Sequence, residues 1–92
     1  MILPAYSVYD KTAETFATPF FAPNDEVAKR NFRYSMKKLD DMFVTDLELF
    51  CVGSFDNELG HFDVHAEEVY LVDTGENVLS EREIEKKNSE VK

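Results

Sequence analysis

The predicted fold depends first on residues 23–43, PNDEVAKRNFRYSMKKLDDMF. Asn24 is a residue type that caps a helix N-terminus, and the acidic Asp25 and Glu26 suit the positive end of the helix dipole. At 100° per residue, one face of this helix collects the apolar residues Ala28, Phe32, Met36, Leu39 and Phe43. We therefore expect an amphipathic helix that ends between residues 39 and 43, because the two aspartates at 40 and 41 are unfavourable near a helix C-terminus.

The same predicted helix has a basic face beside its apolar one. Five of the chain's ten Lys and Arg residues lie between Lys29 and Lys38. The candidate phosphate-binding side chains on this face are Lys29, Arg30, Arg33 and Lys37. Tyr34 borders them and is a candidate for stacking on a base. The alternative is an ordinary solvated helix face whose cations pair with the acidic half of the chain.

Aromatic residues dominate the segment before this helix. Residues 4–10 predict a strand that places Tyr6 and Tyr9 on opposite faces, so at most one of them serves a given base-stacking surface. Residues 15–22 predict an edge strand or an extended arm, because Pro19 cannot donate a ladder hydrogen bond. An edge that carries three phenylalanines needs a covering partner, so we predict a homodimer that associates through Phe16, Phe20 and Phe21. The alternatives for these rings are the core of the domain or a platform for bases.

A predicted β-hairpin follows the helix. It consists of residues 46–55 and 61–65, which alternate in polarity around a turn that ends at Gly60. We expect Phe62 and Val64 to point inward from the second strand. Its outward residues, His61, Asp63 and His65, are metal-ligand types, as is the nearby Glu67. Residues on one strand face stand ~7 Å apart and do not converge, so we predict a polar surface and no bound metal.

The C-terminal part predicts a further strand over residues 68–73 and a short helix. Ser80 and Glu83 fit a capping box, which predicts that this helix starts at residue 80, and we expect residues 86–92 to fray. The resulting fold is α+β: an aromatic N-terminal hairpin, one amphipathic helix and a C-terminal hairpin. We assign residues 1–78 to a single domain and residues 79–92 to a charged helical or frayed tail.

Composition and charge exclude several classes of protein. The chain has 92 residues, a net charge of −9 and one cysteine, Cys51, which we expect to be a small buried hydrophobic residue. There is no glycine-rich phosphate loop and no nucleophile motif, so we predict no enzymatic activity and no cofactor. No apolar run approaches the ~18 residues that span a bilayer, and the N-terminus lacks a basic start followed by an apolar stretch, so we expect a cytosolic protein without membrane contact.

Three short segments carry a resemblance to a known family. They are YSVYD at residues 6–10, TPFF at residues 18–21 with the following helix, and LFCVGSFD at residues 49–56 ahead of Gly60. In this order and spacing, residues 5–62 resemble the small non-structural protein of gokushoviruses, phages with circular single-stranded DNA genomes. The resemblance implies a non-enzymatic DNA-binding role in phage DNA replication and in the switch toward single-stranded genome synthesis and packaging, in the cytoplasm of the bacterial host.

We therefore expect a sequence-tolerant single-stranded DNA-binding protein that also associates with itself. The alternative depends on residues 39–76, which contain eleven acidic residues and no Lys or Arg. Such a surface either keeps the protein in solution or acts as a protein-interaction module that imitates nucleic acid. In the second case the partner is a basic viral or host replication protein.

Overall fold

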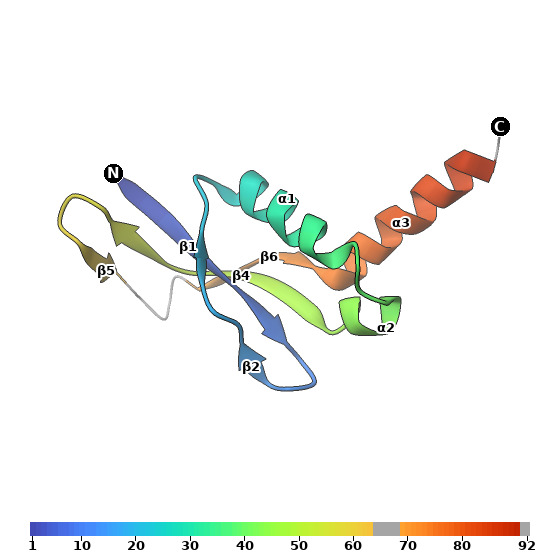
Figure 1. Ribbon diagram of the computed structural model, residues 1–92, viewed down its shortest axis with the longest axis horizontal. Coiled ribbons are helices and arrows are strands. Elements are labelled where there is room, and N and C mark those ends of the chain that lie inside the picture. Colours follow the sequence, from blue (N-terminus) through green and yellow to red (C-terminus); the bar gives the residue numbers. More distant parts are fainter. Residues whose placement is uncertain (64–68, 91–92) are drawn as a thin grey trace.

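Two long antiparallel strands form the centre of the computed structural model, which describes residues 1–63 and 69–90. β1 (Ile2–Asp10) pairs with β4 (Leu47–Asp56) along its whole length, and the two strands cross the middle of Figure 1. A β-bulge interrupts their register between Ala5 and Tyr6. Short strands extend the sheet on both sides, and helices lie on one face, so the predicted α+β class is confirmed.

The outer edge of β1 carries two very short strands. β2 (Thr15–Phe16) pairs with one end of β1, and β3 (Phe20–Phe21) pairs with the other. The predicted edge position of residues 15–22 is therefore confirmed. The strand is interrupted around Pro19, which is consistent with the missing N–H donor of proline.

The outer edge of β4 is shared in the same way. β5 (His61–Asp63) pairs with its C-terminal half and forms the predicted hairpin, while β6 (Tyr70–Thr74) pairs with its N-terminal half. The turn before β5 is closed by Asp56, whose Oδ1 accepts hydrogen bonds from the backbone N–H groups of Glu58 and Leu59. The predicted strand residues 64 and 65 lie outside the described part of the chain.

One face of the sheet is covered by α1 (Asp25–Met36) and the start of α3 (Gly75–Glu90), as Figure 1 shows. Asn24 caps α1 as predicted, since its side chain accepts a hydrogen bond from the Val27 N–H at 2.9 Å. The buried core joins this face to the helices through Tyr6, Ala22, Ala28, Phe32, Met36, Val44, Leu49, Cys51 and Val78. Cys51 is thus a buried free cysteine, as expected.

The predicted end of the first helix is wrong. α1 stops at Met36, and a separate short helix, α2 (Asp41–Val44), follows. The backbone N–H groups of Lys37 and Leu39 bond to carbonyls three residues back, which tightens the last turn and ends the helix. Leu39 and Phe43 are therefore exposed instead of buried, and Val44 fills the core position. The two aspartates begin α2, where the helix dipole favours them.

The last helix starts five residues earlier than predicted. Thr74 is at the N-terminus of α3, because its Oγ1 accepts a hydrogen bond from the Asn77 N–H at 3.1 Å. Ser80 lies inside the helix and bonds to the Glu76 carbonyl, so it is not the cap. The boundary predicted after residue 78 falls within α3, and residues 86–90 are helical rather than frayed. Residues 91 and 92 lie outside the described chain.

Gly75 explains why α3 begins where it does. A Cβ at this position would overlap the Val44 carbonyl group, and it would lie 3.2 Å from the Leu47 carbonyl oxygen. Only glycine lets the start of α3 approach the backbone between α2 and β4 this closely. No helix in the described ranges is both long and apolar enough to cross a membrane.

Candidate nucleic-acid interface

A shallow groove between α1 and the start of α3 carries the predicted phosphate-binding residues. It has a volume of about 520 Å³ and is lined by Lys29, Arg30, Arg33, Tyr34 and Lys37, together with Glu26 and Glu81. The structure thus brings together all five α1 residues predicted for the basic face. Four cations against two carboxylates leave an excess of positive charge here, on a chain whose net charge is −9. We call this the α1 groove.

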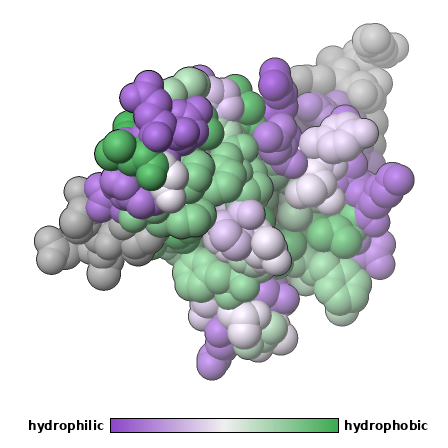
Figure 2. Space-filling view, turned by 60° about the vertical axis from the view of Figure 1, so that its left-hand side comes forward, coloured by the Kyte–Doolittle hydropathy of each residue, from purple (hydrophilic) through white to green (hydrophobic). Residues whose placement is uncertain are grey.

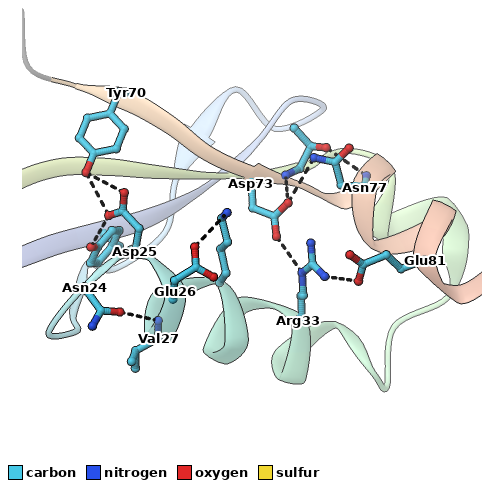
Figure 3. A network of polar contacts seen from close by, with 12 residues as sticks. Asn24, Asp25, Glu26, Val27, Arg33, Tyr70, Asp73, Asn77 and Glu81 are labelled. Atoms are coloured by element: carbon cyan, nitrogen blue, oxygen red, sulfur yellow. Dashed lines mark hydrogen bonds and ion pairs between the residues drawn. The ribbon is translucent and has the colours of Figure 1, made fainter.

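Arg33 is held in the α1 groove by two carboxylates. Its Nε donates to Asp73 Oδ2 at 3.0 Å and its Nη1 donates to Glu81 Oε2, as Figure 3 shows. The hydrogen bond to Glu81 and then the one to Asp73 raise the pKa of Arg33, and the same guanidinium lowers the pKa of Glu81. Arg33 therefore ties α1 to β6 and α3, which leaves it less available to a phosphate than its neighbours.

Asp73 is the buried end of this ion pair. Its side chain is 2% exposed, against 32% for that of Arg33. It also accepts hydrogen bonds from the Thr74 N–H at 2.9 Å and from Asn77 Nδ2 at 3.3 Å. A buried carboxylate needs such partners, because its desolvation would otherwise cost several kcal/mol. Asp73 was not among the residues singled out from the sequence.

The other cations of the α1 groove are held less firmly. Lys29 Nζ lies 3.5 Å from Glu26 Oε1, an exposed pair of the kind that adds little stability. Lys37 Nζ lies 5.2 Å from the ring centroid of Tyr34, which is 72% exposed. Arg30 is exposed, and its side chain makes no hydrogen bond or ion pair within residues 1–63 and 69–90. Lys29, Arg30 and Lys37 are therefore the cations best placed to meet phosphates.

Tyr6 is a core residue, which corrects the prediction that it is available to stack on a base. Its side chain is 0% exposed and packs on Phe20, with ring centroids 5.8 Å apart. Its hydroxyl donates to Asp25 Oδ1 at 2.6 Å, and Tyr70 donates to the same carboxylate (Figure 3). Burial and then the hydrogen bond to Asp25 raise the pKa of Tyr6. Two tyrosines thus fasten the N-terminus of α1 to the sheet.

Tyr9 lies on the sheet face opposite α1. Its neighbour Val8 packs against the core, so the alternation of side chains turns Tyr9 the other way. Its ring centroid is 4.7 Å from that of Phe16 and 6.3 Å from that of Phe50, and those two are 5.7 Å apart. We call these three residues the β2 triad. Because Tyr34 lies on the helix side, Tyr9 cannot join it at the α1 groove.

A second aromatic cluster lies at the other end of the sheet. The ring centroids of Phe21, Phe55 and Phe62 are 4.9–5.9 Å apart, and we call them the β5 triad. Phe62 is 59% exposed, so its predicted inward position is wrong. The three phenylalanines predicted to share one self-association surface are divided, since Phe20 packs against the core while Phe16 and Phe21 belong to different triads.

The sequence offered a signal for only part of this arrangement. Alternation along β4 already placed Phe50 opposite the core residues Leu49 and Cys51. The bulge between Ala5 and Tyr6 shifts the register beyond that point, and this is what turns Phe55 to the same face as Phe50. As for metals, the described residues contain no group of three His, Cys, Asp or Glu side chains that could hold an ion. His65 and Glu67 lie outside that description.

A comparison with families of known proteins gives a match. The family described as Phage ORF5 protein matches residues 3–78, which is most of the chain. No curated protein and no solved structure matches. The matched range includes the α1 residues of the groove and ends before Glu81.

Proposed function

The chain belongs to the Phage ORF5 protein family, and from this premise we propose that it is a non-enzymatic protein that binds single-stranded DNA without sequence preference. The role that we propose is in genome replication, or in the switch to single-stranded genome synthesis and packaging, of a small phage in its bacterial host. The resemblance of residues 5–62 to the gokushovirus small non-structural protein supports this role.

The α1 groove is the observation that carries the proposal. Three cations with at most weak protein partners, Lys29, Arg30 and Lys37, lie within one helix face beside the exposed ring of Tyr34. Cations that follow a backbone and an aromatic ring that takes a base are the two components of sequence-tolerant single-strand binding. Every base has a face that can stack, so this arrangement needs no sequence readout.

The acidic remainder of the chain sets the expected strength of binding. At physiological salt, charges more than ~8 Å from the DNA are largely screened, so the α1 groove can act locally despite a net charge of −9. Contact with about three phosphates predicts a slope of about −2 for log affinity against log salt on a single strand. We therefore expect weak binding that is detectable at low salt and lost as salt rises.

Fluorescence anisotropy with a labelled single-stranded oligonucleotide, measured over a salt series, tests the proposal. Arg30→Glu should weaken binding at least tenfold and should leave the fold intact, because Arg30 is exposed. Lys86→Glu is the matched control: it makes the same change in net charge at an exposed α3 position outside the groove, and it should change affinity less than threefold. Tyr34→Ala should weaken binding by ~1–3 kcal/mol without changing the salt slope.

Two results would remove the proposal. The first is no binding by the folded protein at low ionic strength. The second is equal weakening by Arg30→Glu and Lys86→Glu, since this would mean that only net charge matters and that the α1 groove is not the site.

A second candidate function is supported by an apolar hollow near α2. Leu39, Met42, Phe43 and Leu47 line it, and the acidic residues Asp10 and Asp46 lie among them. Met42 is 69% exposed and Phe43 56% exposed. An apolar patch with carboxylates suits a basic, partly apolar segment of a viral or host replication protein. Under this alternative, DNA binding is undetectable, and neutralising Asp40, Asp41 and Asp46 breaks the contact with the protein partner.

A further inference from the structure

The sheet face turned away from α1 is apolar and has no helix over it within the described residues. It carries the β2 triad and the β5 triad, and Leu71 on β6 is paired with Phe50 beside them. We call the sheet face turned away from α1 the open face. Figure 2 shows one side of the molecule, on which green hydrophobic areas are bordered by purple hydrophilic groups.

The exposed apolar area is large for a protein of this size. Phe16, Phe21 and Phe62 are 51%, 42% and 59% exposed, and Leu71 is 49% exposed. An aromatic side chain has about 150–250 Å² to bury, so the three phenylalanines alone expose roughly 300 Å². Apolar patches of about 300–600 Å² on soluble proteins are often interaction sites. Leu71 and the partly buried rings of Tyr9, Phe50 and Phe55 add to this area, so the open face reaches the upper part of that range.

The two triads are arranged so that a second copy fits them. Tyr9 lies near the C-terminal end of β1, whereas Phe55 pairs with Leu3 near its N-terminal end. Leu3 and Tyr9 are six residues apart on β1, so at ~3.3 Å per residue the two triads lie about 20 Å apart along the strand. A two-fold axis that lies in the interface and crosses β1 midway between the triads places each triad of one protomer opposite the other triad of its partner. We propose that the open face is the interface of a homodimer in which the β2 triad of each protomer packs on the β5 triad of its partner.

The charges around the open face favour a second copy over nucleic acid. Glu48 pairs with Tyr9 across β4 and β1, so its side chain lies on the open face beside the β2 triad. The strands that carry the two triads contain no Lys or Arg, so they offer no cation to a phosphate. In a dimer, the Glu48 carboxylates of both copies lie at the rim of the interface, so this rim is repulsive while the centre is apolar. Added salt should therefore tighten the dimer, because it screens the rim and strengthens apolar burial.

The proposed dimer places the α1 grooves on its outside. Each groove belongs to the helix layer, which lies on the opposite side of the sheet from the open face. Packing two open faces together therefore leaves two grooves on opposite sides of the assembly, related by the two-fold axis. If the grooves bind DNA as proposed above, one dimer holds two segments of single strand running in opposite directions. This last step rests on the proposed function, whereas the dimer does not.

Analytical ultracentrifugation over a concentration series tests the interface. We expect the wild-type chain to be a dimer at micromolar concentration, and its dissociation constant to fall as salt rises from about 0.05 to 0.5 M. Phe16→Ser in one triad and Phe62→Ser in the other should each raise the dissociation constant at least tenfold. Met42→Ser is the matched control, since it removes an apolar side chain that is 69% exposed on α2, and it should have no effect. Circular dichroism should show all three variants folded.

Three results would overturn the proposed interface. They are a wild-type monomer at all concentrations, a dimer that the Phe16 and Phe62 variants leave unchanged, or a dimer that weakens as salt rises. Arg30→Glu separates this inference from the proposed function: it should abolish DNA binding and leave dimerisation unchanged. A dimer without DNA binding would contradict only the proposed function, and DNA binding by a monomer would contradict only the dimer.

Discussion

The ion pair between Arg33 and Asp73 gives the sharpest prediction about stability. Arg33→Met removes the guanidinium that lies 3.0 Å from a carboxylate whose side chain is 2% exposed. Removing one partner of a buried pair costs about 3–5 kcal/mol, because the other charge is left without compensation. Asp73 would keep its bonds to Thr74 and Asn77, and Arg33 is partly exposed. We therefore expect the lower end of that range, about 3 kcal/mol.

This loss is large relative to the stability of a small domain. A chain of 92 residues is stable by roughly 5–14 kcal/mol, so the variant should lose a fifth or more of the total. The melting temperature should fall by roughly 12–24 °C at 4–8 °C per kcal/mol. Urea unfolding followed by circular dichroism measures the change, with Glu81→Ala as a control. The Glu81 side chain is 54% exposed, so its loss should cost under about 1 kcal/mol.

A double variant separates the pair itself from the cost of an unpaired charge. Arg33→Met combined with Asp73→Asn leaves no buried charge, and it should recover most of the stability that Arg33→Met loses. If Arg33→Met costs less than about 0.5 kcal/mol, Asp73 is not confined as the structure places it. The single variant Asp73→Asn completes the comparison. If the stability lost by Arg33→Met and the stability lost by Asp73→Asn simply add in the double variant, the two side chains are not coupled and the ion pair is refuted.

Three further perturbations probe the fold and its pH dependence. Gly75→Ala should destabilise the protein by about 3 kcal/mol or fail to fold, because its Cβ would overlap the Val44 carbonyl group, and thermal unfolding will show whether it does. Asn24→Ala should cost about 1 kcal/mol in urea unfolding, because it removes the cap of α1. Arg33 lowers the pKa of Glu81 in the folded state, so this carboxylate contributes stability above the ordinary value of 4.5 and loses it as the pH falls through the lowered value. The stability advantage of wild type over Glu81→Gln should therefore be present at neutral pH and vanish in acid, and a constant difference across pH would contradict the ion pair.

Local sequence patterns predicted the elements of the fold better than their ends. The cap at Asn24, the edge position of residues 15–22 and the hairpin around Gly60 follow from residue types with a strong local preference. The C-terminus of α1 and the start of α3 do not. The start of α3 depends on close backbone packing at Gly75, and the Met36 carbonyl at the end of α1 accepts a hydrogen bond from Arg82. No local pattern of residues reports such contacts between distant parts of the chain.

The sequence likewise predicted some parts of the candidate site and not others. Helical periodicity brought the five α1 residues of the groove together correctly, because they lie on one element. Helical periodicity did not predict the ion pair between Arg33 and Asp73. The position of Asp73 depends on the pairing of β6 with β4, where a bulge between Leu49 and Phe50 shifts the register, and side-chain alternation does not predict such a bulge. The two aromatic triads each combine residues from three strands, and their membership depends on strand order and register.

Chemical-shift mapping of the ¹⁵N-labelled chain with a short oligothymidylate at low salt shows which residues contact single-stranded DNA. If the α1 groove is the binding site, the shifts concentrate on residues 29–37 and on Glu81 across the groove, and they decline as salt is added. The amides of Phe16 and Phe62 on the open face should change little. Shifts confined to the open face, or no shifts at all in a folded sample, would contradict the claim that the α1 groove binds single-stranded DNA.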